Sequence, residues 1–249
     1  MPGKPEQGWY VYGIVESDVE VVPGRTGVAD APVDIARDKR LSALVSTIEL
    51  DRPLGTPEDL HAHKDLLDAT AVDAPVLPFR FGAVLDSKEA VVEELLEPHE
   101  EEFANALREL DGKAQYVVRA RYVEQAILRE ILSENSRAAR LREKIGPDPG
   151  ESSRTQQIQL GEIINAAVEA KRDRDTEALV ELLQPVSVTI NIRPPTHELD
   201  AAHVAFLERI EEHSDVEDAL TGLAERWAGR ANVRLLGPMA AYDFVVTTQ

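Results

Sequence analysis

Apolar residues recur along this chain with two different periods, which predict two kinds of element. A period of two, rich in β-branched and aromatic residues, predicts strands, whereas a period of three to four predicts amphipathic helices. Strands are expected at 9–15, 41–50, 76–81, 113–122, 186–192, 232–236 and 242–247, with a weaker candidate at 33–35. Helices are expected at 56–72, 87–110, 123–145, 155–183 and 218–228. The segment 202–210 fits either period.

Local signals set several ends of these elements. Thr56 can cap the free N–H groups of the first helix, and Pro57 suits its first helical position. Pro98 lies inside the second helical pattern, so we expect a kink or a break near Glu97. The run 146–153, rich in Gly and Pro, predicts a loop.

The strand at 186–192 alternates regularly, which predicts four inward side chains: Val186, Val188, Ile190 and Ile192. Strands and helices alternate along the chain without regular βαβ units. This order is typical of an α+β architecture. A chain of 249 residues could form one large domain or two smaller ones.

The charge balance is strongly acidic, with 46 Asp and Glu against 27 Lys and Arg and a net charge of −19. No dense patch of Lys and Arg stands out, which argues against nucleic acid and membranes as partners. Cysteine is absent, so disulfides and thiolate sites are excluded. No run approaches the roughly 18 apolar residues of a membrane helix, and residues 1–7 lack the apolar core of a signal peptide. We expect a cytoplasmic protein that self-repulsion keeps dispersed.

Few side chains form a pattern that predicts catalysis or metal binding. His61 and His63 stand two residues apart on a predicted helix, so they face opposite sides and cannot easily share an ion. The acids of the second helix follow helical spacing and predict a solvated face with few positive partners: Glu93, Glu94, Glu97, Glu100, Glu101 and Glu102. The sequence therefore predicts no catalytic residue, no metal ligand and no cofactor.

Arg80 is the most informative single charge. It stands between Phe79 and Phe81 in a predicted strand, so its side chain should point away from both rings. One interpretation is a surface or carboxylate-paired arginine that fixes the strand, and the other is an anchor for a partner.

Three short segments carry a family resemblance: 9–15 (WYVYGIV), 76–85 (VLPFRFGAVL) and 235–249 (LLGPMAAYDFVVTTQ). Taken in this order they resemble the GvpF/GvpL family of gas vesicle accessory proteins. That family opens with an aromatic-rich strand, carries an LPxRFG segment and closes on a GPxxPYxFV-like strand. Ala241 departs from the pattern, because the family usually has proline there, and we expect a looser turn.

The resemblance implies two α+β domains, 1–112 and 113–249, the second a modified ferredoxin-like fold with a helical insertion at about 123–183. It favours a strand at 202–210. It also implies a set of motif residues that either maintain the fold or contact a partner: Trp9, Tyr10, Pro78, Arg80, Phe81, Gly82, Gly237, Pro238, Tyr242 and Phe244.

Two functional hypotheses follow. The resemblance implies a non-enzymatic minor component of the gas vesicle, which binds the small hydrophobic major shell protein (GvpA type) and other accessory proteins during nucleation or assembly. Such a protein could cover the apolar face of the shell protein or add an edge strand to its sheet. The alternative is a small-molecule- or haem-binding ferredoxin-like protein, with or without catalytic activity, which requires a concave pocket with convergent polar groups.

Overall fold

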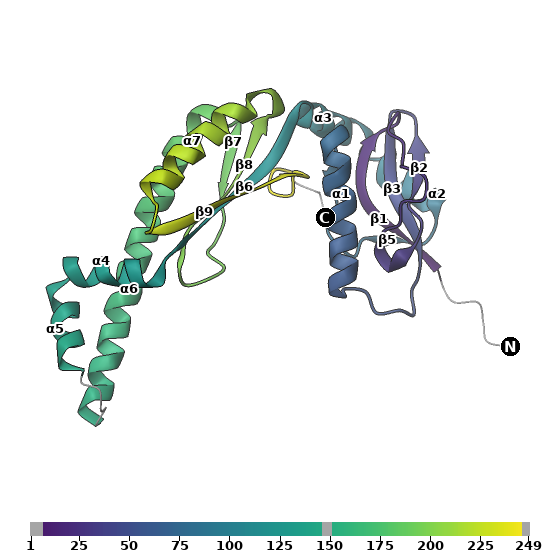
Figure 1. Cartoon of the computed structure of the whole chain (residues 1–249). Coiled ribbons are helices and arrows are strands. Elements are labelled where there is room, and N and C mark those ends of the chain that lie inside the picture. The colour runs from purple at the N-terminus through teal and green to yellow at the C-terminus, as the bar shows by residue number, and fades with distance from the viewer. Residues whose placement is uncertain (1–6, 146–150, 246–249) are drawn as a thin grey trace. The chain divides into compact units, whose positions relative to one another are not determined.

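The computed structural model describes residues 7–145 and 151–245, of which 151–153 are described by their backbone alone. Of the loop expected at 146–153, residues 146–150 lie outside the described residues, as do Val246 and Thr247. Residues 151–153 are already helical, which corrects that part of the prediction. The chain is 48% helical and 27% strand with two antiparallel sheets, which confirms the α+β class. Its contacts form two compact units, Met1–Gln115 with Gly237–Gln249 and Tyr116–Leu236 (Figure 1).

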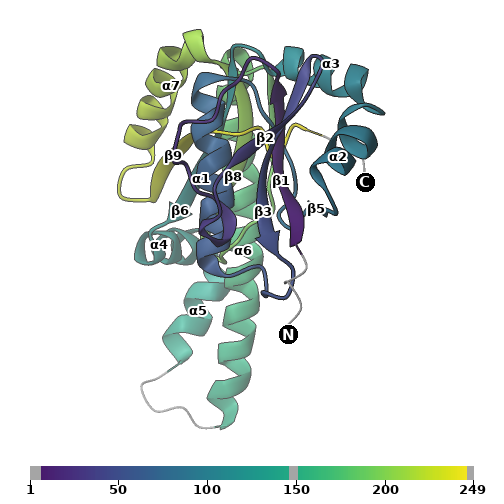
Figure 2. The same ribbon diagram turned by 90° about the vertical axis from the view of Figure 1, so that its right-hand side faces the viewer.

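The first unit is built on a sheet with strand order β2-β3-β1-β4, and β5 also pairs with β1. Its strands are β1 (Gln7–Glu16), β2 (Asp34–Asp38), β3 (Leu41–Glu49), β4 (Leu77–Pro78) and β5 (Val84–Leu85). Its helical segments are η1 (Val28–Asp30), α1 (Pro57–Asp73), α2 (Lys88–Ala90), the π-helix η2 (Val91–Leu96) and α3 (Glu100–Leu110). In Figure 2, α1 lies on one side of the sheet and α2 and α3 lie on the other. Residues 10–15 of β1 are all buried, because both of its faces are covered.

The helix ends follow the predicted signals. The Thr56 hydroxyl accepts a hydrogen bond from the Asp59 N–H at 3.2 Å, and the Asp59 carboxylate accepts one from the Thr56 N–H at 3.4 Å. This reciprocal pair is a capping box, which satisfies two N–H groups at the start of α1. The predicted break near Pro98 is confirmed, since η2 ends at Leu96 and α3 begins at Glu100.

The predicted strand at 76–81 is much shorter than expected. Only Leu77 and Pro78 pair with β1. The Phe79 N–H still bonds to the Tyr12 carbonyl at 2.8 Å, but the chain then turns at Phe81 and Gly82. Gly82 has a φ of 95°, a left-handed conformation that glycine adopts without strain and that ends the pairing.

The second unit is built on a sheet with strand order β7-β8-β6-β9. Its strands are β6 (Lys113–Tyr122), β7 (Thr189–Ile192), β8 (Asp200–Arg209) and β9 (Ala231–Met239). Its helical segments are α4 (Glu124–Glu134), α5 (Ser136–Lys144), α6 (Glu151–Leu183), η3 (Gln184–Val186), η4 (Ile210–Glu212) and α7 (His213–Arg226). The helices α6 and α7 cover this sheet, and α4 and α5 pack against the first half of α6 (Figure 1). The segment 202–210 is a strand, as the family resemblance favoured.

Two further predicted strands differ from the structure. The segment 186–192 is a strand only from Thr189, and Val188 and Ile192 are 43% and 59% exposed, so the inward assignment is wrong. The physical reason is that β7 lies at the edge of its sheet, where α6 packs mainly over β8. The other difference is at 242–244, where the chain forms a turn rather than a strand. Gly237 and Pro238, expected to form the turn before it, instead lie within β9.

No helix among the described residues is long and apolar enough to cross a bilayer.

Candidate functional site

Motif residues from β1 and from the segment after β4 meet α1 at a buried aromatic cluster. Tyr10 is fully buried, and its hydroxyl lies 2.8 Å from Nδ1 of His63. The Gly82 N–H donates to the same hydroxyl at 3.2 Å. The Phe81 ring lies 5.8 Å from the Tyr10 ring and 5.6 Å from the His63 ring, both edge-on. Three of the predicted motif residues are therefore brought together.

The hydrogen bonds of His63 determine its tautomer. Its Nε2 lies 3.2 Å from the Phe79 carbonyl, and a carbonyl only accepts, so Nε2 carries the proton. Nδ1 is then the acceptor, and Tyr10 donates its hydroxyl proton to it. Burial lowers the pKa of His63 below its ordinary value of 6.5, against a smaller opposing effect of the bond to Phe79. The imidazole is neutral, and its place in the core indicates a structural role.

A second buried tyrosine extends this cluster. The Tyr12 hydroxyl donates to Ser46 Oγ at 2.9 Å and accepts from the Val28 N–H at 2.8 Å. A Cβ atom on Gly27 would come within 2.1 Å of that hydroxyl, so glycine is required there. The sequence indicated only a loop at Gly27, because no local signal points to a tyrosine fifteen residues earlier.

The C-terminal motif joins the first unit through α1. The Ala240 N–H and the Tyr242 hydroxyl both donate to Asp68 Oδ1, each at 3.1 Å. Ala240 is buried in the same core cluster as Tyr10, and Tyr242 packs against that cluster. The Asp243 N–H also donates to the Gln115 side chain at 3.0 Å. These bonds hold the turn at 242–244 in place of a strand.

The other motif residues lie apart from this cluster or on its border. Pro78 is buried in β4, and Trp9 is half-buried beneath Lys88, whose ammonium lies 5.5 Å from the ring centroid. Phe244 is half-buried. Arg80 is exposed, lies outside any strand, and forms no hydrogen bond or ion pair with the described residues. No carboxylate in the described chain therefore fixes it.

The predicted histidine and acidic clusters have different outcomes. His61 is exposed and His63 is buried, so they face opposite sides of α1 as predicted. The acids predicted to form a solvated face are exposed except for the half-buried Glu100, and Glu100 and Glu101 at the start of α3 have positive partners. Arg40 pairs with Glu100 at 3.0 Å and with Glu101 at 2.7 Å, because the turn between β2 and β3 brings it beside α3. Among the residues described, no three His, Cys, Asp or Glu side chains converge to hold a metal ion.

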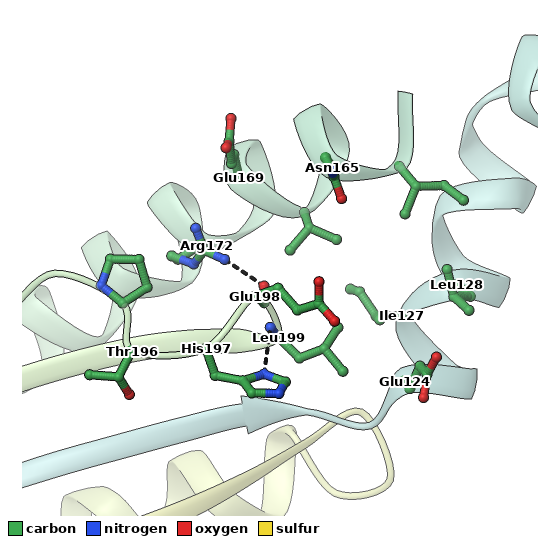
Figure 3. Close-up of a pocket in the computed structure, with 13 residues that line it drawn as sticks. Glu124, Ile127, Leu128, Asn165, Glu169, Arg172, Thr196, His197, Glu198 and Leu199 are labelled. Carbon is green, nitrogen blue, oxygen red and sulfur yellow. Dashed lines mark hydrogen bonds between the residues drawn. The ribbon is translucent and has the colours of Figure 1, made fainter. Parts of the chain in front are cut away.

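The second unit has a hollow of about 490 Å³ between α4, α6 and the loop before β8 (Figure 3). Arg172 reaches this hollow from α6, but its guanidinium already donates to the Glu198 and Asp200 carbonyls at 2.6 and 2.7 Å. His197 Nδ1 accepts from the Leu199 N–H at 3.0 Å. The Arg172 guanidinium and the His197 imidazole therefore hold the loop in place. Among the described residues that line the hollow, no set of free hydrogen-bond donors converges on a point where a small ligand could bind.

Asp200 organises the same loop from the start of β8. It is 5% exposed and accepts hydrogen bonds from the N–H groups of Thr196 and His197 at 2.8 and 2.9 Å. Arg121 adds an ion pair at 3.1 Å. Burial by itself would raise the pKa of Asp200, but these bonds outweigh it and lower the pKa. The loop between β7 and β8 is consequently a fixed surface.

An ion network around the buried Lys171 fixes α4 against α6. Lys171 on α6 is 4% exposed and donates to Glu130 at 2.5 Å and to Glu134 at 2.7 Å on α4. Arg230 pairs with Glu130 and with Asp175, both at 2.8 Å. Each cation is shared between two carboxylates, and this attraction offsets the free-energy cost of removing the charges from water. The helices α4 and α6 therefore present a rigid surface.

Comparisons with known proteins identify the family. The family described as "Gas vesicle synthesis protein GvpL/GvpF" matches residues 8–246. A curated relative, gas vesicle protein F of Streptomyces sp. (strain CB03234), is 32% identical over 95% of this chain and 98% of its own length. Gas vesicle protein L1 of Halobacterium salinarum is 26% identical over 74% of this chain and 67% of its own length.

Solved structures agree in fold. The crystal structure of gas vesicle protein GvpF from Anabaena sp. PCC7120 superposes with a TM-score of 0.79 over 98% of this chain and 100% of that chain, at 20% identity. The GvpF structure from Microcystis aeruginosa gives a TM-score of 0.75 over 95% and 98%, also at 20% identity. The match to the family profile spans nearly the whole sequence and takes in most or all of each motif segment. The chain therefore belongs to the GvpL/GvpF family of gas vesicle synthesis proteins.

Proposed function

We propose that this chain is a non-enzymatic assembly factor, which binds the small hydrophobic major shell protein of the gas vesicle in the cytoplasm. Binding would cover apolar surface of the shell protein and limit its aggregation before it enters the growing wall. The observation that carries this proposal is the uncovered apolar side of the edge strand β7.

The strand β7 pairs with β8 on one side only, so its outer edge has backbone groups that no strand of this sheet uses. Val188 and Ile192 are 43% and 59% exposed beside that edge. Ile192 also lines a hollow of about 680 Å³ together with Val180, Pro194 and Pro195. An extended apolar segment could pair with the edge through its main chain and place alternate side chains in the hollow.

The acidic surface supports the same role. A net charge of −19 makes copies of this chain repel one another. This repulsion opposes aggregation through the exposed apolar edge, to which a neutral protein would be more prone. Complexes of this chain with a shell subunit would repel one another in the same way until the subunit enters the wall. Other accessory proteins of the gas vesicle are further partners in this proposal.

We also infer that the two units correspond to the two predicted domains, with a boundary near 112 but with 237–249 joined to the first domain, and that the second is a modified ferredoxin-like fold. The element order supports this inference, since β6, the helices α4 to α6, β7, β8, α7 and β9 follow the β-α-β-β-α-β pattern. The helices at 123–183 would then be an enlarged first crossover. The segment from Gly237 would return to the first domain.

The motif residues divide into two roles in this proposal. Tyr10, Phe81, Gly82 and Tyr242 maintain the fold, because their contacts lie within the core of the first unit. Arg80 is the motif residue best placed to contact a partner, because it is exposed and no described residue neutralises it.

Co-expression with the shell protein tests the proposal. The variant carrying Val188→Asp and Ile192→Asp places two carboxylates at the β7 edge, and Val72→Asp is a matched control, since Val72 is 58% exposed on α1. Apolar anchors of an interface each contribute about 1 kcal/mol or more, so the double variant should lower the soluble, co-purified shell protein by about tenfold or more. Val72→Asp should leave it unchanged.

Two results would contradict the proposal. One is a shell protein whose solubility does not respond to the wild-type chain and that does not co-purify with it. The other is a double variant that remains folded by circular dichroism and still retains the shell protein at the wild-type level. Arg80→Ala, in the same assay, tests whether the motif arginine contributes to the contact.

A further inference from the structure

A separate apolar groove lies between α4, α5 and α6, away from β7. Its volume is about 480 Å³. Leu128 and Leu132 line it from α4, and Leu160 and Ile164 line it from α6. Each pair is four residues apart and so forms a short ridge on one side of its helix. Two apolar ridges are the walls that an amphipathic helix requires of its receptor groove.

The charges at the rim of the groove are all positive. Arg129 and Arg142 are its only charged lining residues in the described chain, both are exposed, and neither forms a salt bridge with a described residue. Arg142 belongs to α5, whose sequence SRAARLREK has four basic residues and one acidic residue. The sequence alone showed no dense basic patch, because α5 is short and its neighbours in the chain are acidic. The fold concentrates this positive charge beside the apolar groove.

We propose that this groove binds an amphipathic helix of a partner protein, with an apolar stripe and acidic residues on both sides of that stripe. The apolar side chains of the helix would enter between the two ridges, and its carboxylates would pair with Arg129 and Arg142. Such pairs would also steer a strongly acidic protein and its partner into one orientation. This binding site goes beyond the proposed function and does not depend on it, since β7 lies outside the groove.

Other occupants fit the groove less well. A second copy of this chain could offer the acidic helix α3, but Phe103 and Leu107 on its apolar side are already buried in its own core. Nucleic acid would satisfy the arginines but has no apolar side chains to fill the space between the ridges. Both remain measurable outcomes of the test.

The test uses the full chain and two fluorescein-labelled synthetic helices. Both helices carry the same leucine stripe at i, i+3, i+4 and i+7, and their flanking positions are all glutamate in one and all lysine in the other. Fluorescence polarisation at low ionic strength should give at least about tenfold tighter binding of the glutamate helix. Arg129→Glu combined with Arg142→Glu should remove that preference or reverse it.

Arg174→Glu is the matched control. Arg174 is exposed on α6 outside the groove, and its Nε donates to the carbonyl four residues earlier, as the Nε of Arg129 does. This variant should bind the glutamate helix within about twofold of the wild type. A Leu132→Asp variant that stays folded by circular dichroism should bind neither helix.

Several results would overturn the inference. They are equal affinity for the two helices, no saturable binding of the glutamate helix, or an equal loss in Arg174→Glu. Duplex DNA or polyglutamate that binds as tightly as the glutamate helix would replace it with a polyanion site. Concentration-dependent dimers that disappear in the double arginine variant would replace it with self-association. Failure here leaves the co-expression result with the β7 variants unaffected, so the two proposals are tested separately.

Discussion

At the residue scale, the motif residues stabilise the first unit mainly through hydrogen bonds between segments that are far apart in the sequence. The hydroxyl of Tyr10 connects three segments, because it donates to His63 on α1 and accepts from the Gly82 N–H. Without this hydroxyl, the His63 Nδ1 atom and the Gly82 N–H would lose these hydrogen bonds. Leaving a buried polar group unpaired costs more than a hydrogen bond contributes on average.

Tyr10→Phe should therefore lower the free energy of unfolding of the first unit by about 1–3 kcal/mol. The change removes one oxygen and leaves the ring packing intact, so the loss of unfolding free energy measures the contribution of the hydrogen bonds. Urea denaturation measures it, with Trp9 as the reporter in a Trp227→Phe background, since Trp9 lies in the first unit and Trp227 in the second. Tyr116→Phe is the control for a buried tyrosine whose hydroxyl has no hydrogen-bond partner within the described chain. Tyr116 lies in the second unit, so Trp227 reports its effect in a Trp9→Phe background, and a comparable loss there would contradict the argument.

The lowered pKa of His63 makes the stability of the first unit depend on pH. Burial lowers its folded-state pKa below 6.5, so the unfolded chain binds a proton that the folded chain does not. The free energy of unfolding should consequently fall as the pH is lowered from about 7.5 to about 5.5, by at most about 1.4 kcal/mol per pH unit. Denaturation followed by Trp9 fluorescence at several pH values measures this slope.

His63→Gln provides the comparison for that slope. The substitution destabilises the protein at every pH but removes the titrating group, so the slope in this window should become smaller. Three carboxylates of the same unit, those of Asp34, Asp59 and Glu100, have pKa values lowered below their ordinary values by hydrogen bonds and cationic partners, so they stay ionised across this range. An unchanged slope in His63→Gln would show that another group is responsible.

At the element scale, the periods of the sequence predict most helices and strands, but they fail where an element depends on its neighbours. The strand at 186–192 has the alternation of a buried strand, yet it forms only from Thr189 and exposes Ile192. Alternation determines which side chains share a face, but the position of α6 determines whether that face is covered. Local caps are more reliable, because Thr56 and Asp59 act on their own helix end.

The contact between α4 and α6 depends on charges far apart in the sequence. Lys171→Met should lower the free energy of unfolding of the second unit by about 2 kcal/mol, because it removes a buried cation shared by Glu130 and Glu134. Trp227 fluorescence during denaturation, in a Trp9→Phe background, measures the loss. Arg209→Met removes the exposed pair with Glu212 and should cost less than about 0.5 kcal/mol. Equal effects of the two substitutions would argue against a stabilising role of the buried Lys171.

At the scale of the whole molecule, the chain returns to its starting unit at its C-terminal end. After β9, Ala240 enters the core of the first unit and Tyr242 bonds to Asp68. The sequence placed this segment as a final strand at 242–247, because its alternation of aromatic and β-branched residues is typical of strands. The three motif segments lie almost entirely in the first unit, and the intervening residues from Tyr116 form the second.

Tyr242→Ala should accordingly destabilise the first unit and not the second. We expect a loss of about 2 kcal/mol from the packing of the half-buried ring and its bond to Asp68. Denaturation of the two single-tryptophan proteins measures the units separately. A shift seen by Trp227 and absent from Trp9 would contradict the assignment of this segment to the first unit.

The sequence by itself determined the α+β class, the helix caps, the break at Pro98 and the family, because each depends on residues near one another or on motifs read in order. It also determined the acidic net charge. Only the tertiary structure decided that the Tyr10 and Tyr242 motifs share a core, that the apolar side of β7 is uncovered, and that an arginine of α5 borders a groove. Those features depend on which segments become neighbours in space, and no local period or composition specifies that.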